Sequence, residues 1–154
     1  MVTVNLPDME ATEQLGGALA GALLPGSSIV LLEGSLGAGK STFVRGFLRA
    51  LGVTGPVASP TYGLVHSYAV REGGVHHADV YRVETLHELE QTGMLDELRR
   101  GVWLIEWGSR FASEWPSDHL VVHIDVSGAV RVARIAANGQ KHTALFESLC
   151  RNLS

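Results

Sequence analysis

Residues 29–42 read IVLLEGSLGAGKST, an apolar run followed by a glycine-rich loop that ends in Lys40, Ser41 and Thr42. The stretch from Gly34 to Ser41 matches the P-loop spacing G-x-x-x-x-G-K-[ST] in full. In such a loop the backbone N–H groups turn inward on a phosphate, the lysine reaches the outer phosphates and the hydroxyl ligates magnesium. The stretch therefore predicts a site for a nucleotide and Mg²⁺, with candidate contacts at Gly34, Leu36, Gly37, Ala38, Gly39, Lys40, Ser41 and Thr42.

The flanks of the loop predict the elements that it joins. Ile29 to Leu32 is an unbroken β-prone run of the kind that is buried in a parallel sheet. From Ser41 to Leu51, apolar residues recur at helical spacing before Gly52. The loop is therefore expected at a helix N-terminus, where the helix dipole favours anions. A chance glycine-rich turn is the alternative, and these flanks disfavour it.

The composition limits the class of protein. A chain of 154 residues, 45% of them hydrophobic, suffices for one core, so residues 1–154 are expected to form one domain. The net charge of −4 has the wrong sign for a protein that holds nucleic acid over its whole surface, and Arg131 and Arg134 are interpreted as local surface charges. No membrane-length apolar stretch or signal peptide is present and Cys150 is the single cysteine, so we expect a cytoplasmic protein.

The rest of the chain predicts further elements around the P-loop. Strands are expected at residues 2–6, 62–70, 75–83, 102–107, 120–126 and 130–136, and helices from Asp8 to Leu23, from Thr85 to Arg100 (one helix broken at Gly93, or two short ones) and from Thr143 to Leu153. A P-loop after an early strand, with crossover helices and later strands, predicts an α/β three-layer P-loop NTPase fold with a mixed, mainly parallel sheet. The nucleotide is expected at the carboxyl ends of the parallel strands.

Two carboxylates qualify for chemistry on the nucleotide. Phosphoryl transfer needs a carboxylate that holds or orients the magnesium shell and a group that positions the attacking oxygen. Glu106 ends the most hydrophobic strand after the P-loop, and Asp79 lies in HADVYR. Asp79, Glu106 and Lys40 are therefore the candidate catalytic residues, although an ordinary strand-end salt bridge is the alternative for each carboxylate. Asp125 is assigned no role, because it leads into a hairpin turn.

A loop after the P-loop helix offers a further hydroxyl. In Ser59-Pro60-Thr61, Pro60 stiffens the chain and Thr61 could offer its hydroxyl to magnesium or the γ-phosphate, as switch loops do. His76 and His77 are adjacent on a predicted strand, so they face opposite ways and cannot both ligate one metal. No set of histidines and carboxylates has zinc spacing.

Four motifs, GSLGAGKST, SPTYGLV, HADVYR and IEWG, follow one another along the chain. In this order and at these intervals they resemble the TsaE (YjeE-type) family of small bacterial P-loop ATPases, over roughly residues 8–137. Four ordered motifs are far more specific than a P-loop alone. The resemblance implies an ATPase that takes part in threonylcarbamoyl modification (t6A) of adenosine 37 in tRNAs that read codons starting with A.

The resemblance also implies roles for residues and partners. Lys40 and the P-loop amides would bind ATP phosphates, Ser41 or Thr42 would bind Mg²⁺, and the further functional positions would be Thr61, Asp79, Glu106 and Trp107. Ser109, which follows IEWG, is assigned no role. The family's ATPase does not make the modification itself. The resemblance implies that it docks on a heterodimer of TsaD- and TsaB-type proteins, that its ATP cycle resets this complex, and that the partners hold most of the tRNA.

Two other functions are open on the sequence alone. A small-molecule kinase of the P-loop type usually carries an acceptor-binding segment and an arginine-rich lid late in the chain, where residues 108–154 predict a hairpin and a helix instead. A nucleotide-gated adaptor without significant turnover needs the same nucleotide-binding residues as a slow ATPase, so the sequence separates these two functions poorly. A GTPase is disfavoured because the chain lacks an Asn-Lys-x-Asp segment. Arg82 is the candidate source of transition-state charge within the chain.

Overall fold

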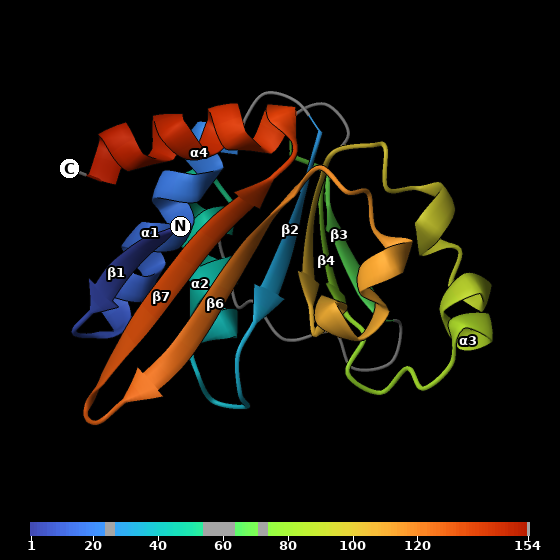
Figure 1. The fold of residues 1–154 in the computed structure, drawn as a ribbon, viewed down its shortest axis with the longest axis horizontal. Coiled ribbons are helices and arrows are strands. Elements are labelled where there is room, and N and C mark those ends of the chain that lie inside the picture. Colours follow the sequence, from blue (N-terminus) through green and yellow to red (C-terminus); the bar gives the residue numbers. More distant parts are fainter. Residues whose placement is uncertain (24–26, 54–63, 71–73, 154) are drawn as a thin grey trace.

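The computed structural model describes residues 1–23, 27–53, 64–70 and 74–153 (Figure 1). The strands are β1 (Val2–Leu6), β2 (Ser28–Glu33), β3 (Val65–Tyr68), β4 (Val75–Asp79), β5 (Val102–Glu106), β6 (His119–Ser127) and β7 (Val130–Asn138). The helices are α1 (Met9–Leu23), α2 (Lys40–Ala50), α3 (Leu86–Gln91) and α4 (Gln140–Leu153), with short 3₁₀ helices η1 (Met94–Asp96) and η2 (Gly108–Glu114).

The strands form one seven-stranded sheet in the order β1-β7-β6-β2-β5-β4-β3. The middle strands β6, β2, β5 and β4 pair in parallel. The outer pairs are antiparallel, β1 with β7 and β7 with β6 on one side and β3 with β4 on the other. The predicted mixed sheet is confirmed, and so is the hairpin predicted after Asp125, which is β6 with β7. Because β2, β4 and β5 are parallel, their carboxyl ends meet at one end of the sheet, the lower end in Figure 1.

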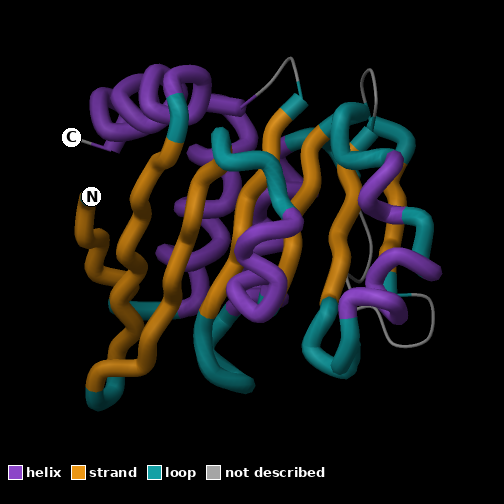
Figure 2. Tube along the Cα trace, turned by 45° about the vertical axis from the view of Figure 1, so that its right-hand side comes forward, coloured by secondary structure: helices purple, strands orange, loops and turns teal. Residues whose placement is uncertain are grey.

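Side chains of the central strands alternate between two apolar layers. In β2, Val30 and Leu32 join the core on the side of α1 and α2, whereas Ile29 and Leu31 join the core on the opposite face. β5 alternates in the same way. Figure 2 shows helical segments on both sides of the strands. Unbroken apolar runs such as IVLL are typical of strands covered on both faces, which is the three-layer arrangement that the sequence predicts.

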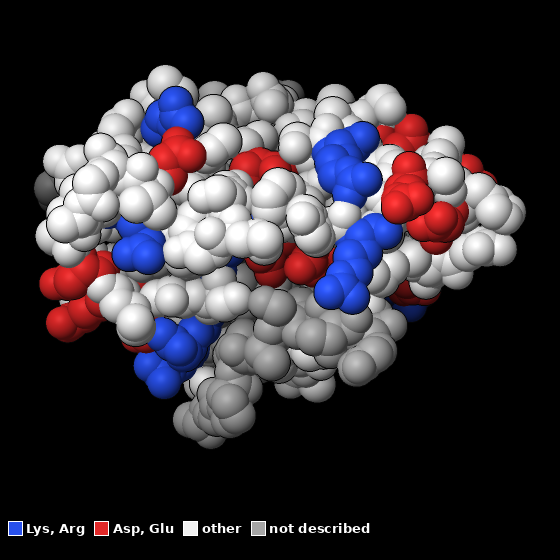
Figure 3. All heavy atoms as spheres, turned by 90° about the horizontal axis from the view of Figure 1, so that it is seen from below, with Lys and Arg blue, Asp and Glu red and all other residues white. Residues whose placement is uncertain are grey.

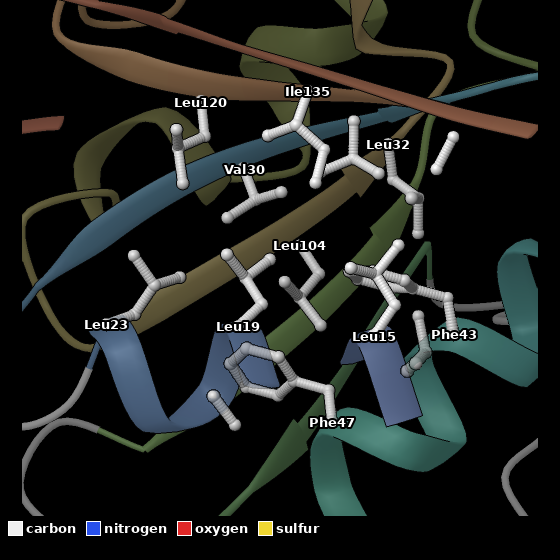
Figure 4. Packing of buried hydrophobic residues seen from close by; sticks show 14 of the residues in the cluster. Leu15, Leu19, Leu23, Val30, Leu32, Phe43, Phe47, Leu104, Leu120 and Ile135 are labelled. Atoms are coloured by element: carbon white, nitrogen blue, oxygen red, sulfur yellow. The ribbon is translucent and has the colours of Figure 1, made fainter. Parts of the chain in front are cut away.

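The larger core lies between the sheet and the pair of helices α1 and α2 (Figure 4). In this core Leu15, Leu19 and Leu23 of α1 and Phe43 and Phe47 of α2 meet strand residues that include Val30, Leu32, Leu104, Leu120 and Ile135. Full burial of each such side chain stabilises the fold by roughly 1.5–3 kcal/mol. The core therefore holds α2, and with it the P-loop, against the carboxyl end of β2.

Helix boundaries follow the capping signals of the sequence. The N–H of Ala11 donates to Asp8 Oδ1 at 2.8 Å, so Asp8, with which this helix was predicted to begin, caps α1. Thr85 caps α3 by accepting from the N–H of Glu88 at 3.2 Å. Gly93 has φ of 78° and separates α3 from η1, which confirms the break predicted there. A residue with a Cβ rarely adopts this left-handed conformation.

The predicted strand through Val83 is wrong, because β4 ends at Asp79. The Asp79 side chain accepts a hydrogen bond from the N–H of Tyr81 at 2.9 Å, and the N–H of Val83 donates to the carbonyl of Val80. The chain therefore turns after the aspartate. Val80 and Val83 are buried all the same, in the core on the α3 side. Their burial as turn residues is why the apolar pattern misled the prediction.

The 3₁₀ helix η2 is absent from the sequence-based expectation, since its sequence GSRFASE has no apolar period. It follows β5 and covers the sheet on the face opposite α1 and α2. Within the described ranges no helix combines the length and hydrophobicity that a bilayer crossing requires.

Candidate nucleotide-binding site

A cavity of about 300 Å³ opens at the carboxyl ends of β4 and β5, beside the P-loop. Its lining comes from segments far apart in the sequence and consists of Met9, Thr12, Leu36, Gly37, Gly39, Lys40, Ser41, Thr42, Asp79, Glu106, Trp107 and Arg131. Figure 3 looks onto this end of the molecule, where acidic and basic side chains are interspersed.

The glycines shape the P-loop. Gly34, Gly37 and Gly39 have φ of 144°, 79° and 113°, a region that disfavours other residues. A Cβ at Gly34 would lie 2.4 Å from the backbone oxygen of Ile124, so the loop crosses β6 only with glycine there. Gly39 is the N-cap of α2 and has no side chain that could occupy the free N–H groups of the first turn. The loop thus leaves a helix N-terminus open toward the cavity.

Lys40 is buried at the base of this cavity, with 5% of its surface exposed. Its Nζ donates to the carbonyl of Gly34 at 2.7 Å, lies 3.9 Å from Glu106 Oε1 and lies 4.0 Å from the centroid of the Trp107 ring. Burial lowers the pKa of the Lys40 ammonium, against the opposing attraction of nearby carboxylates, chiefly that of Glu106. A cation held in this setting favours an anionic ligand.

The two predicted carboxylates lie side by side. Asp79 and Glu106 are the last residues of β4 and β5 and are register partners across these parallel strands. Glu106 is only 3% exposed, and its Oε2 lies 2.5 Å from Nε2 of His77. The structure thus brings Asp79, Glu106 and Lys40 together in one cavity.

The two carboxylates have different surroundings. Burial raises the pKa of Asp79 above its ordinary value of 3.8, and the charge of Glu106 adds to the rise. The backbone N–H of Tyr81 and the charge of Lys40 oppose it. Glu106, in contrast, is held between the ring of His77 and the ammonium of Lys40. A carboxylate with a raised pKa is the better proton acceptor while it stays ionised, so Asp79 is a candidate base.

Trp107 follows β5 directly and lines the cavity. Its backbone N–H donates to the carbonyl of Leu32 at 3.3 Å, which continues the pairing of β5 with β2 by one residue. Its ring covers Nζ of Lys40 and lies 4.8 Å from the ring of Tyr81, centroid to centroid. The indole therefore forms one wall of the candidate site.

Three lining residues, Met9, Thr12 and Arg131, were not predicted from the sequence. Arg131 lies on β7, where its Nη2 donates to the carbonyl of Gly37 at 3.1 Å. Its Nε is buried and has no hydrogen-bond partner among the described residues. The sequence shows only an arginine beside a hairpin turn, and no local signal connects it, Met9 or Thr12 to the P-loop.

Two predicted P-loop contacts do not line the cavity. Gly34 points its carbonyl at Lys40, and Ala38 is fully buried with its N–H donating to the carbonyl of Ser35 at 3.1 Å. The other predicted loop contacts, Leu36, Gly37, Gly39, Ser41 and Thr42, do line it. Thr61 lies outside the described residues.

Further polar residues near the strand ends have other partners or positions. Arg82 is exposed and is not among the lining residues. Asp125 pairs with Arg134 across the β6–β7 hairpin at 2.5 Å. Glu33, at the end of β2, accepts hydrogen bonds from the N–H and the hydroxyl of Ser109 at 2.7 and 3.2 Å. This contact ties β2 to η2, so Ser109 supports the loop after β5.

The donor set fits a phosphate ligand accompanied by a hard cation. Lys40 and Arg131 can pair with phosphate oxygens. Among the residues that the structure describes, no group of three or more His, Cys, Asp or Glu side chains could hold a metal ion. Mg²⁺, however, is commonly bound through one or two protein ligands together with substrate phosphates. Ser41 and Glu106 are the residues available for such a shell.

Comparisons with known proteins find matches over most of the chain. A family model described as "Threonylcarbamoyl adenosine biosynthesis protein TsaE" matches residues 6–134. The protein of that name from Bacillus subtilis is 37% identical over 153 residues, which cover 97% of this chain and 92% of the relative. The Synechocystis protein of the same name is 40% identical over 109 residues, which cover 68% of this chain and 69% of the relative.

A solved structure, the crystal structure of Bacillus subtilis YdiB, superimposes with a TM-score of 0.80 at 28% sequence identity. The superposition covers 99% of this chain and 96% of the solved one.

Proposed function

The chain belongs to the TsaE family of tRNA threonylcarbamoyladenosine biosynthesis proteins, and from this premise we propose that it is an ATPase subunit of that process. It binds ATP with Mg²⁺ and hydrolyses it in support of the threonylcarbamoylation of adenosine 37 in tRNAs that read codons starting with A. The observation that carries the proposal is the convergence of a P-loop, a buried lysine and two strand-end carboxylates on one cavity.

The P-loop residues bind the phosphates in this proposal. The open N–H groups at the start of α2 and the ammonium of Lys40 face the anion. The hydroxyl of Ser41 and the carboxylate of Glu106 hold the Mg²⁺ shell, with Thr42 beside them in the first turn. When bound, the Mg²⁺ ion neutralises charge that develops on the phosphate oxygens. The indole of Trp107 excludes water from one side of the lysine.

Asp79 and Glu106 have different roles. Asp79, whose pKa is raised by burial, accepts a hydrogen bond from the attacking water and orients it. Glu106, held by His77 and near Lys40, contributes to the metal shell.

Asp79→Asn and Glu106→Gln should each lower the turnover of ATP more than its affinity, because each keeps volume and removes charge. Steady-state hydrolysis and calorimetric binding test this, with Asp125→Asn as the control, and wild-type turnover in both site variants would refute the assignment.

The protein acts through partners. The net charge of −4 and the mixed charges at the cavity end disfavour autonomous tRNA binding, so TsaD- and TsaB-type proteins hold most of the tRNA. The ATP cycle of this chain resets their complex after each transfer, and hydrolysis by the isolated chain is slow.

Reconstitution with purified TsaD- and TsaB-type partners, tRNA and ATP tests the proposal. Modified adenosine is measured by chromatography after tRNA digestion, over many turnovers. Lys40→Ala should abolish multiple turnover, because it removes the cation that faces the phosphates. Lys141→Ala, which removes the other lysine at an exposed site, should not. Equal modification by wild type and Lys40→Ala would refute the proposed role and favour the kinase alternative.

A further inference from the structure

His77 is a fully buried histidine of β4 that contacts Glu106, one of the residues that line the candidate site. Its side chain is 0% exposed and does not line the cavity. Its Nε2 lies 2.5 Å from Oε2 of Glu106, while its Nδ1 is buried with no hydrogen-bond partner among the described residues. A buried polar atom without a partner costs about 1–3 kcal/mol. Packing alone therefore gives no reason for a histidine at this position.

The sheet geometry explains how the ring reaches the carboxylate. His77 and Asp79 are two residues apart on β4 and so lie on one face of the sheet. Their register partners on β5 are Leu104 and Glu106. His77 therefore lies two residues before the end of β4, farther from the cavity than the two carboxylates. Across the strands it is a diagonal neighbour of Glu106.

The hydrogen bond has one direction when Glu106 is ionised. An ionised carboxylate only accepts, so Nε2 of His77 carries the proton and donates it to Oε2. The other carboxylate oxygen, Oε1, is then left on the side of Lys40, 3.9 Å from its Nζ.

We propose that His77 is a positioning residue, which anchors one oxygen of Glu106 and thereby aims the other into the cavity. The inference rests on the proposed ATPase function, because it concerns a carboxylate of that same site. His77 touches neither the cavity nor its contents, so it acts on turnover through Glu106.

Loss of the His77 donor has a defined consequence. Oε2 of Glu106, which is buried, loses its hydrogen bond, and the carboxylate turns toward Lys40 as the nearest cation. Removal of a residue that orients a metal-site ligand typically lowers activity about 10–100-fold. We expect a fall of this size in kcat with little change in KM, because the P-loop amides and Lys40 that bind the phosphates remain.

Two substitutions of His77 by an amide side chain test whether a donor must lie at the position of Nε2 or whether any polar side chain suffices. A glutamine side chain places an N–H near the position of histidine Nε2, whereas the shorter asparagine side chain does not reach it. His77→Gln should therefore keep kcat near the wild-type value, and His77→Asn should lose it. Thermal unfolding of both variants checks that the fold is intact. Equal kcat for wild type and His77→Asn in folded proteins overturns the inference.

A double-mutant cycle separates positioning from a general structural role. In the Glu106→Gln background, His77→Asn should lower kcat no further, because the oriented carboxylate is already absent. If His77→Asn lowers kcat by the same factor in the wild-type and Glu106→Gln backgrounds, then the histidine acts independently of Glu106 and the inference fails.

A readout that needs no nucleotide is the ring N–H of His77 in protein labelled with ¹⁵N-histidine. We expect a downfield proton on Nε2 that is protected from solvent exchange, disappears in His77→Asn and moves upfield in Glu106→Gln. His142 pairs with Asp118 through Nδ1, so the type of ring nitrogen distinguishes the two histidines. Absence of the Nε2 signal from the folded wild type overturns the positioning role and leaves the proposed function standing. A wild type that shows the signal but hydrolyses no ATP with its partners refutes the proposed function instead.

Discussion

Trp107 has φ of 63°, a left-handed backbone conformation that is rare for a residue with a large side chain. Such a conformation costs on the order of 1–3 kcal/mol and persists where the surrounding structure enforces it. Here the chain leaves β5 and turns at Trp107 into η2, which swings the indole over Nζ of Lys40. The strain is therefore located where β5 ends and the cavity begins.

Arg131 is the residue whose role in nucleotide binding can be tested against a close neighbour. Arg131→Ala should lower ATP affinity about tenfold or more, because a hydrogen bond to a charged group contributes about 1.5–3 kcal/mol and 1.4 kcal/mol is a factor of ten. Calorimetric titration with a non-hydrolysable ATP analogue and Mg²⁺ measures the change. Arg134→Ala, on the same strand but paired with Asp125, should bind like wild type. Equal losses in the two variants would contradict a specific role for Arg131.

At the scale of elements, α1 and α2 approach each other closely through glycine. A Cβ at Gly46 of α2 would lie 2.0 Å from the backbone oxygen of Glu13 in α1. The Glu13 side chain pairs with Arg45 and Arg49 of α2 at 2.9 and 3.2 Å. The position of the P-loop helix therefore depends on a contact in which backbone meets backbone.

Gly46→Ala should destabilise the protein by about 1–3 kcal/mol, since the added methyl group can be accommodated only by moving one helix. Gly21→Ala in α1 is the matched control, because a Cβ there meets nothing within 4 Å. That change should be neutral or stabilising by up to about 1 kcal/mol through the higher helix propensity of alanine. Urea unfolding measures both changes, and a Gly46→Ala protein as stable as wild type would show that the helices separate at little cost.

The helix α4 is attached to the sheet through His142. Its Nε2 accepts from the N–H of Ile29 at 3.3 Å, and its Nδ1 lies 2.6 Å from Asp118 Oδ1. Burial lowers the pKa of His142 below its ordinary value of 6.5, against the opposing effect of Asp118. For Asp118 itself burial acts upward, but hydrogen bonds from His142 and Lys141 together hold its pKa below 3.8.

These directions predict that acid weakens the attachment. As the pH falls through about 6.5, the unfolded chain takes up a proton at His142 before the folded protein does, so stability decreases by up to about 1.4 kcal/mol per pH unit for this group. The lowered pKa of Asp118 adds a further loss at lower pH. His142→Gln should have a flatter dependence of unfolding free energy on pH between 7 and 5, whereas His87→Gln, at an exposed position, should keep the wild-type slope. A wild-type slope in His142→Gln would refute the attribution.

At the scale of the whole molecule, the cavity draws residues from α1, the P-loop, α2, β4, β5 and β7. A ligand that contacts all of them binds the folded chain and not the unfolded one. ATP with Mg²⁺ at 100 times its dissociation constant should therefore stabilise the fold by about 2.7 kcal/mol. Thermal unfolding with and without nucleotide measures the effect, and Lys40→Ala should lose it. A nucleotide-dependent shift of wild-type size in Lys40→Ala would contradict the placement of the site.

A feature of the fold or of the site could be predicted from the sequence when the residues that indicate it lie close together along the chain. The strand, loop and helix of residues 28–50 follow from apolar period and glycine spacing within a few residues of each other. Glu106 was singled out because it ends a predicted apolar strand, and Asp79 because it lies in HADVYR; that both are the last residues of neighbouring parallel strands emerged only from the structure. The end of β4 was missed because Val80 and Val83 are buried as turn residues, and η2 because its sequence has no period.

The sequence by itself therefore determined the P-loop with its flanking strand and helix, most of the separate strands, and Asp79 and Glu106 as candidates, because each rests on a pattern contained within one segment. Only the tertiary structure decided which distant residues complete the site. Arg131 meets Gly37 across 94 positions of the chain, and His77 meets Glu106 across 29. These contacts depend on strand order and register, which are fixed by how the whole sheet buries its apolar faces. A single segment carries no signal for them, since the partner that gives each side chain its role lies in another strand.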